Sequence, residues 1–193
     1  MTHKRNTFDE KLPHTKLPHG YRAWRACCGM LQESDLYALL DKQGIEYSIV
    51  RHKAVFTAEE ALEADIPERG IFVKNLFLSD KKKREFYLVT VPLDARTDLK
   101  VLSGMLQSRR LQFVNADLLP KMLGVEAGSV TPLATLNDET RHVTQVFDEA
   151  LAGKVIGAHP LVNTATIYVN TDDVCALIAQ RGNPIVFLPL SSS

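Results

Sequence analysis

The chain has 193 residues, and its 23 lysine and arginine residues balance 23 aspartate and glutamate residues, so it carries no net charge at neutral pH. This length suffices for one domain with a hydrophobic core, and the balanced charge excludes a general attraction to nucleic acids, so any RNA contact must come from local patches. No apolar run approaches the roughly 20 residues of a membrane-spanning helix and no segment resembles a signal peptide, so we expect a cytoplasmic protein that does not contact a membrane.

The first 30 residues differ in character from the remainder of the chain. Residues 1–29 contain six lysine and arginine residues against Asp9 and Glu10, and they show neither a helical nor a strand period. We therefore expect residues 1–30 to form a basic, flexible extension and residues 31–190 to form the folded domain. Contact between this basic tail and RNA stays open as an alternative.

The three cysteines, Cys27, Cys28 and Cys175, form no CxxC pair. Because an odd number of cysteines does not indicate a disulfide framework, the sequence favours a reducing compartment. Cys27 and Cys28 lie in the basic extension and are poor candidates for a catalytic nucleophile. Cys175 is expected to act as a packing residue of a helix.

The folded domain is expected to begin with two short helices and a strand between them. Three leucines at helical spacing predict a helix over residues 34–43, with Ser34 as its N-cap. Residues 46–50 are typical of a strand. A capping box that begins at Thr57 predicts a second helix over residues 57–64.

Residues 70–78 predict the central strand, because one lysine, Lys74, stands in an otherwise apolar sequence. Alternation places Lys74 on one face of this strand and Asn75 on the other, and both faces are mainly apolar, as in the middle of a sheet. An ammonium group there must find a partner, reach a cleft or lose its charge. Lys74 therefore lines a pocket or extends to solvent at the sheet edge, and this segment alone favours neither.

A partner strand at residues 85–91 would form a hairpin whose tip is strongly basic. The tip contains Lys81, Lys82, Lys83 and Arg84. Such a charge run is usually a solvated turn that protects against aggregation, but beside an RNA substrate it would contact phosphate. Arg109 and Arg110 form a second basic patch further along the chain.

The remaining elements alternate between short helices and short strands. Three helices are expected, at 98–106 with Asp98 as N-cap, at 115–123 ending at Gly124, and at 171–181 with Thr171 as N-cap; strands are expected at 111–114, 143–147, 154–158, 164–170 and 185–188. In the strand at 164–170 we expect one core face and one polar face. These short connections predict an α+β fold with a mixed, largely antiparallel central sheet flanked by short helices.

The sequence contains no nucleophile elbow, no phosphate-binding glycine loop and no dense cluster of metal ligands. His52, His142 and His159 are far apart in the sequence, so a zinc site built from them is disfavoured. We therefore predict neither a metal nor a cofactor.

Three local combinations are candidates for a binding or catalytic site. They are Lys74 with Asn75, the loop formed by Gly128, Ser129, Val130, Thr131 and Pro132, and His159 with Asn163. Each has an ordinary alternative, because the loop is also typical of a plain turn and a histidine before a proline is more often structural.

Together, three stretches resemble a known family: residues 72–78, the loop at 128–132, and residues 159–166, which read His-Pro-Leu-Val-Asn-Thr-Ala-Thr. In this order and at these separations they resemble the bacterial prolyl-tRNA synthetase-associated editing domain, also called the YbaK-like deacylase family. The likeness runs from about residue 31 to residue 190 and is greatest to the freestanding branch that removes alanine from mischarged proline tRNA.

The resemblance implies a reaction and a set of roles. The reaction is hydrolysis of the ester that joins a wrong amino acid to the terminal adenosine of tRNA. The lysine that matches Lys74 is the residue on which activity depends, and holding the terminal ribose or phosphate is its expected task. The loop at 128–132 positions the aminoacyl group, and His159 lines the pocket. Asn75 and Asn163 are expected in the same pocket, with the two basic patches on tRNA phosphates.

The resemblance leaves the exact substrate and the partners open. Alanyl-tRNA(Pro) is the expected substrate, because a small pocket can exclude the proline ring by steric means. A deacylase for cysteinyl-, seryl- or threonyl-tRNA is one alternative, and a tRNA-binding adaptor without catalysis is another. The acceptor end of tRNA(Pro) is the expected partner; docking to prolyl-tRNA synthetase or an elongation factor stays open, as does the oligomeric state.

Overall fold

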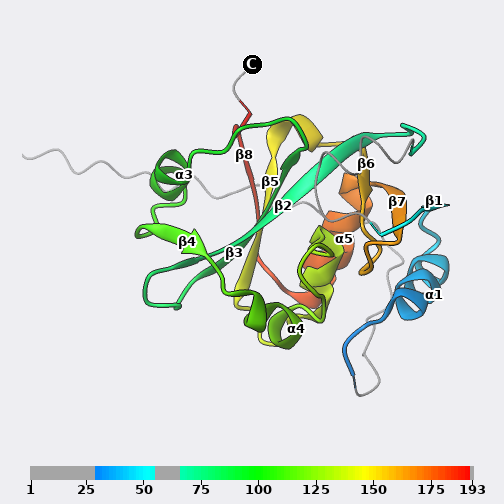
Figure 1. Ribbon diagram of the computed structural model, residues 1–193, viewed down its shortest axis with the longest axis horizontal. Coiled ribbons are helices and arrows are strands. Elements are labelled where there is room, and N and C mark those ends of the chain that lie inside the picture. Colours follow the sequence, from blue (N-terminus) through cyan, green and yellow to red (C-terminus); the bar gives the residue numbers. More distant parts are fainter. Residues whose placement is uncertain (1–28, 55–65, 192–193) are drawn as a thin grey trace, which may run out of the picture.

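A twisted eight-stranded sheet forms the centre of the protein (Figure 1). The structure is a computed structural model that describes residues 29–54 and 66–191. The strands lie in the order β1-β7-β6-β2-β3-β5-β8, and β4 pairs separately with β2. Their bounds are β1 (Tyr47–Arg51), β2 (Ile71–Asp80), β3 (Phe86–Pro92), β4 (Leu111–Phe113), β5 (Val143–Asp148), β6 (Val155–Ala158), β7 (Ala165–Asn170) and β8 (Ile185–Leu188).

Short helices connect and cover these strands. The α-helices are α1 (Glu33–Gln43), α3 (Leu99–Met105), α4 (Leu119–Met122) and α5 (Thr171–Arg181), and the 3-10 helices are η1 (Ala116–Leu118), η2 (Pro132–Asn137) and η3 (Glu149–Leu151). Four strand pairs are antiparallel and three are parallel. The predicted α+β fold with a mixed sheet is therefore confirmed. No helix in the described ranges is long and apolar enough to cross a membrane.

Strand β2 divides the core between the two faces of the sheet. Phe77 belongs to the larger core, in which apolar side chains of α1, α4, α5 and η2 are buried. Leu78, the next residue, belongs to a smaller core that contains Leu102 of α3. We call the face of β2 that carries Phe77 the larger-core face, and the face that carries Leu78 the smaller-core face. Because neighbouring side chains alternate, Asn75 lies on the larger-core face and Lys74 on the smaller-core face.

Most of the expected elements are confirmed, and the predicted caps of two helices are wrong. The first helix begins after Gln32 rather than at Ser34, because the Asp35 carboxylate accepts the Gln32 amide at 3.0 Å. The last helix is capped by Asn170 rather than Thr171, since the Asn170 side chain accepts the Asp172 amide at 2.8 Å. Capping follows side-chain geometry, which a run of several capping residues does not determine.

Two further expectations change in the structure. The helix expected at 115–123 is divided into η1 and α4, because Pro120 has no N–H with which to continue one regular helix. The polar face expected for the strand at 164–170 is wrong: Thr166 and Tyr168 are only 4% and 3% exposed. Tyr168 packs edge-on against Phe72 and donates its hydroxyl to the Pro67 carbonyl, so β7 is covered on both faces. The helix expected at 57–64 and residues 1–28 lie outside the described residues.

Asn137, at the end of η2, fastens the chain that precedes α1 to the body of the protein. Its side chain accepts the Leu31 amide at 2.6 Å and donates to the carbonyls of Leu31 and Leu123 at 3.3 and 3.0 Å. Asn137 is 4% exposed, so water cannot replace these three hydrogen bonds. One buried amide therefore holds both the start of the described fold and the end of α4.

We expect Asn137→Ala to lower the free energy of unfolding by about 2 kcal/mol, because it leaves buried backbone groups without partners. Urea denaturation measures this change, with Gln112→Ala on the exposed edge of β4 as control. Equal stability of the two variants would contradict the anchoring role.

Candidate functional site

Strand β2 has an open segment along one edge. Its other edge pairs with β3 from Val73 to Ser79. The edge opposite β3 pairs with β6 only at Ile71 and Phe72, and with β4 only from Leu78 to Asp80. Between these two pairings, the Val114 amide donates to the Phe77 carbonyl at 3.0 Å, and no other strand of the described chain reaches this segment.

The main-chain groups of Val73 and Asn75 point to this open edge. The Phe72 carbonyl accepts the Leu93 amide on the β3 side, and the Phe77 carbonyl faces Val114 on the other side. Because N–H and C=O directions alternate along a strand, Val73 and Asn75 share the direction of Phe77. An interior strand therefore presents main-chain donors and acceptors that a ligand can use.

Lys74 stands between these two residues, with its side chain on the smaller-core face. The side chain is half-buried, and no carboxylate of the described residues lies within ion-pair distance of it. An ion pair joins Arg51 to Glu33, away from Lys74 in the sequence. The Lys74 ammonium group is thus available to an anionic or polar ligand at the open edge.

Asn75 begins a chain of hydrogen bonds that crosses the sheet. Its amide nitrogen donates to the Val130 carbonyl at 3.0 Å, and its side-chain oxygen accepts the Thr90 hydroxyl at 2.7 Å. Gln145 donates to the Thr90 oxygen at 3.0 Å and accepts the Thr135 hydroxyl at 2.8 Å. Thr90, Thr135 and Gln145 are fully buried. Strands β2, β3 and β5 therefore hold the segment from Val130 to Thr135 through side chains alone.

Sequence reasoning missed Thr90, Gln145 and Thr135. A signal for Gln145 was present, because alternation in the strand Val143–Asp148 places it on the same face as Val143 and Phe147, which are both buried. A glutamine among core residues needs polar partners, and Thr90 is a polar residue within the apolar strand β3.

The predicted loop at 128–132 is an ordered and largely buried segment. Gly128 has a φ of +89°, which favours glycine. Ser129 and Thr131 are 6% and 0% exposed, and Pro132 begins η2. Hydrogen bonds within the described residues use the carbonyl of Val130, whereas the amides of Val130 and Thr131 take part in none. The buried Thr131 hydroxyl also lacks a partner there.

His159 lies one residue past the end of β6. Gly157 pairs with Phe72 in parallel register, so continuing this register brings His159 level with Lys74 on the smaller-core face. Its Nδ1 lies 3.3 Å from the Ala165 carbonyl, which can only accept a hydrogen bond. Nδ1 therefore carries the proton of the neutral ring, and Nε2 has a free lone pair.

Burial lowers the pKa of His159 below its ordinary value of 6.5, and the nearby charge of His52 lowers it further, although the bond to Ala165 opposes this shift. His52 comes from the end of β1, where its Nε2 lies 3.0 Å from the Thr166 hydroxyl and its Nδ1 2.7 Å from the Lys53 carbonyl. Sequence reasoning treated the two histidines as unrelated, because the pairing of β7 with both β1 and β6 is not visible in the sequence.

Asn163 is partly exposed in the turn between β6 and β7 and makes no hydrogen bond to another described residue. In the described ranges, no group of three or more His, Cys, Asp or Glu side chains is arranged to hold a metal ion. Of the predicted residues, Asn75 and the loop are joined by a hydrogen bond on the larger-core face of β2. Lys74 lies on the smaller-core face, where the extended β2–β6 register also places His159. No contact among the described residues places Asn163 at this segment of β2.

The two basic patches lie side by side at the far end of β2. Asp80 pairs with Leu111, so Arg109 and Arg110 precede β4 next to the hairpin tip. Along the strand, the tip at Lys81 lies about 23 Å from Lys74, at a rise of roughly 3.3 Å per residue. The patches are thus separate from the open edge but belong to the same strand.

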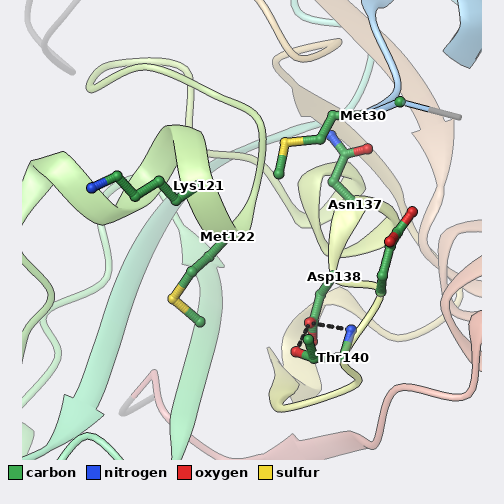
Figure 2. A pocket seen from close by; sticks show the side chains of 8 residues that line it. Met30, Lys121, Met122, Asn137, Asp138 and Thr140 are labelled. Carbon is green, nitrogen blue, oxygen red and sulfur yellow. Dashed lines mark hydrogen bonds between the residues drawn. The ribbon is translucent and has the colours of Figure 1, made fainter.

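A cavity of about 350 Å³ lies elsewhere, between α4, the end of η2 and the start of the described chain (Figure 2). Its lining residues are Gly29, Met30, Lys121, Met122, Asn137, Asp138, Glu139 and Thr140. The polar groups of Asn137 already bind Leu31 and Leu123, and the Asp138 carboxylate accepts hydrogen bonds from Thr140, Val143 and Asn183. These groups hold the fold together, so the cavity is a weaker candidate than the open edge.

Comparisons with known proteins point to one family. The family model of the aminoacyl-tRNA editing domain matches residues 52–177. The chain is 40% identical to the prolyl-tRNA editing protein ProX of Acetoanaerobium sticklandii, over 76% of this chain and 90% of that protein. It is 36% identical to the prolyl-tRNA synthetase associated domain-containing protein 1 of Danio rerio, over 80% of this chain and 85% of that protein.

A solved structure shares the fold. It is described as a proposed trans-editing enzyme for prolyl-tRNA synthetase, and it matches with a TM-score of 0.62 at 22% identity, covering 86% of this chain and 100% of the other.

We expect Thr90→Val to loosen the loop at 128–132, because it removes the hydroxyl that joins Asn75 to Gln145. The free energy of unfolding should fall by about 1–2 kcal/mol. Hydrogen exchange of peptides that span the loop should accelerate more than exchange in α5. Thr144→Val, at a half-buried position on β5, is the matched control. Unchanged exchange in the loop would contradict the proposed anchoring.

The lowered pKa of His159 predicts a specific pH dependence. Below pH 6.5 the unfolded chain binds a proton at this residue more readily than the folded chain, so acidification through this range destabilises the fold. Its NMR titration midpoint should lie below 6.5, and His159→Gln should reduce the loss of stability on acidification. His142→Gln, at an exposed position, is the control. A midpoint at or above 6.5 would contradict the burial of a neutral ring.

Proposed function

Because the chain belongs to the aminoacyl-tRNA editing domain family, we propose that residues 31–190 hydrolyse the ester bond between a wrong amino acid and the terminal adenosine of tRNA. The observation that carries this proposal is the arrangement at the open edge of β2. Among the described residues, a lysine without an ion pair, a histidine with a lowered pKa and main-chain groups without hydrogen bonds are placed there around an ordered loop.

A water molecule is the nucleophile in this proposal. Cys175 is unsuited to attack, since burial first and then the charge of Asp172 raise the pKa of its thiol to about 12. It also packs against the larger core. Water adds to the ester carbonyl, the bond to the ribose oxygen breaks, and that oxygen takes up a proton. An aminoacyl ester is already reactive, so orientation of water and stabilisation of the oxyanion supply the acceleration.

Main-chain amides at the open edge are the proposed oxyanion donors. Candidates are Val73 and Asn75 on β2, together with Val130 and Thr131 in the loop. Donors of this kind are effective because the sheet fixes them before the substrate arrives. The hydrogen bond from Asn75 to the Val130 carbonyl holds the amides of the loop in a fixed position relative to the amides of β2, which makes Asn75 a positioning residue.

We assign Lys74 to the tRNA end of the substrate and His159 to its aminoacyl end. The ammonium group of Lys74, which forms no ion pair with another described residue, binds the terminal ribose or phosphate of the tRNA. The neutral ring of His159 presents the Nε2 lone pair, which accepts a hydrogen bond from the aminoacyl ammonium group or from the attacking water.

Alanyl-tRNA(Pro) is the proposed substrate. Space on the smaller-core face is limited beside Lys74, because Phe72 and Tyr168 pack over Gly157. A single methyl group added to Gly157 would lie 2.9 Å from the Tyr168 ring and 3.1 Å from the Phe72 ring. Such crowding supports a pocket that admits alanine and excludes the proline ring by steric means.

We expect the wild-type protein to release alanine from alanyl-tRNA(Pro) and to leave prolyl-tRNA(Pro) intact. Lys74→Ala should lower kcat/KM for alanine release by about 100-fold, in line with loss of one group that stabilises the bound ester. Lys42→Ala, at an exposed position on α1, is the control.

Hydrolysis of cysteinyl- and seryl-tRNA(Pro), measured in parallel, defines the selectivity of the protein for the amino acid. Faster hydrolysis of either would move the preferred substrate from alanine to that amino acid. Binding of tRNA(Pro) without hydrolysis of any ester would overturn the proposed activity and indicate an adaptor.

A further inference from the structure

A continuous basic surface forms where the hairpin between β2 and β3 meets the start of β4. Pairing of Asp80 with Leu111 brings together two segments that are distant in the sequence. All six basic side chains are exposed: Lys81, Lys82, Lys83, Arg84, Arg109 and Arg110. The neighbouring Glu85 carboxylate accepts the hydroxyl groups of Ser108 and Tyr87. We call these six residues the basic surface.

Asp80 fixes the backbone of the hairpin tip from within. It is 2% exposed, and its carboxylate accepts the amides of Arg84 at 2.6 Å, Lys82 at 3.2 Å and Glu85 at 3.2 Å. Lys83 takes a φ of +53°, which is unusual for a residue other than glycine. A buried carboxylate thus holds the tip in one conformation and leaves the six cationic groups to face solvent, with no ion pair among the described residues.

An exposed aromatic ring lies between the basic surface and Lys74. Phe113 of β4 is 62% exposed and stands opposite Leu78 of β2, so both residues face the same side of the sheet. Leu78 lies on the smaller-core face, as Lys74 does. Along β2, Leu78 lies about 13 Å from Lys74, at a rise of roughly 3.3 Å per residue. Phe113 stands level with Leu78 and is therefore displaced from Lys74 by about the same distance along the strand direction.

Resting on the proposed function, we infer that the basic surface and Phe113 form the path by which tRNA reaches the open edge. Phosphates of the acceptor stem bind the basic surface, a base of the single-stranded 3′ end stacks on Phe113, and the ester arrives beside Lys74. Exposed cations that form no ion pair with another described residue match a phosphate backbone, and an aromatic ring near them suits an unpaired base. The basic surface lies at the end of β2, and Phe113 lies on the neighbouring strand β4, level with a residue between that end and Lys74.

The test compares a complete substrate with one that lacks the stem. Alanyl-tRNA(Pro) and the alanyl ester of the trinucleotide CCA are hydrolysed side by side, and the ratio of their kcat/KM values is measured. Lys82→Glu with Arg110→Glu should lower this ratio by about tenfold and reduce the salt dependence of tRNA binding by about two charges. The matched control is Lys42→Glu with Lys154→Glu, which changes the net charge equally at exposed positions away from the basic surface.

Phe113→Ala tests the stacking step separately. It should weaken hydrolysis of both substrates by about tenfold, mainly through KM, because both contain the single-stranded end. Val101→Ala, at a residue that is 53% exposed on α3, is the control. Kinetics equal to those of Val101→Ala would remove Phe113 from the path.

A ratio equal to that of the control pair would overturn the basic surface as a tRNA contact, and so would an equal loss on both substrates. Failure of the wild type to hydrolyse either ester would instead reject the proposed function. Binding of deacylated tRNA(Pro) by the same variants at several salt concentrations then still decides whether the basic surface contacts RNA.

Discussion

The hydrogen bonds of one half-buried side-chain amide, that of Asn75, determine the geometry of the candidate site. Asn75 projects into the larger core, where a polar group without a hydrogen bond would cost about 1–3 kcal/mol. It is satisfied on one side by Thr90 and on the other by the Val130 carbonyl. Movement of the loop away from β2 would therefore break the hydrogen bond between the half-buried Asn75 amide and the Val130 carbonyl. Because side chains alternate along β2, Lys74 points to the face opposite Asn75. These two neighbouring residues therefore put a cation on one face of the strand and the contact to the loop on the other face.

The register between β2 and β6 determines which residues share the smaller-core face with Lys74. In the parallel pair of β2 and β6, residues at the same level point to the same face, and an extension of this register beyond Phe72 and Gly157 places His159 level with Lys74. Antiparallel pairing of β7 with β1 and β6 then carries Thr166 and His52 into the same neighbourhood. Because β4 pairs with the far end of β2, the edge between His159 and Phe113 is left unpaired. Among the described residues, the positions of short strands thus create the opening.

Local patterns predicted the elements well, whereas contacts between distant elements needed the structure. Alternation identified β2 and placed Lys74 and Asn75 on opposite faces, and the basic tip of the hairpin followed from composition. Alternation could not show that β7 is covered on both faces, since that depends on Phe72 and the chain near Pro67. Nor could it show that the two basic patches are one surface, because that depends on the pairing of Asp80 with Leu111.

The most direct test of the site is to map where the end of a charged tRNA binds. A non-hydrolysable analogue of alanyl-adenosine, in which an amide replaces the ester, can be titrated into isotopically labelled protein and followed by NMR. If the open edge of β2 is the site, the largest shifts will occur at the amides of Val73, Asn75 and Val130 and at the ring of His159. Shifts confined to the cavity beside Met30 and Asn137 would contradict this account and move the site from the open edge to that cavity.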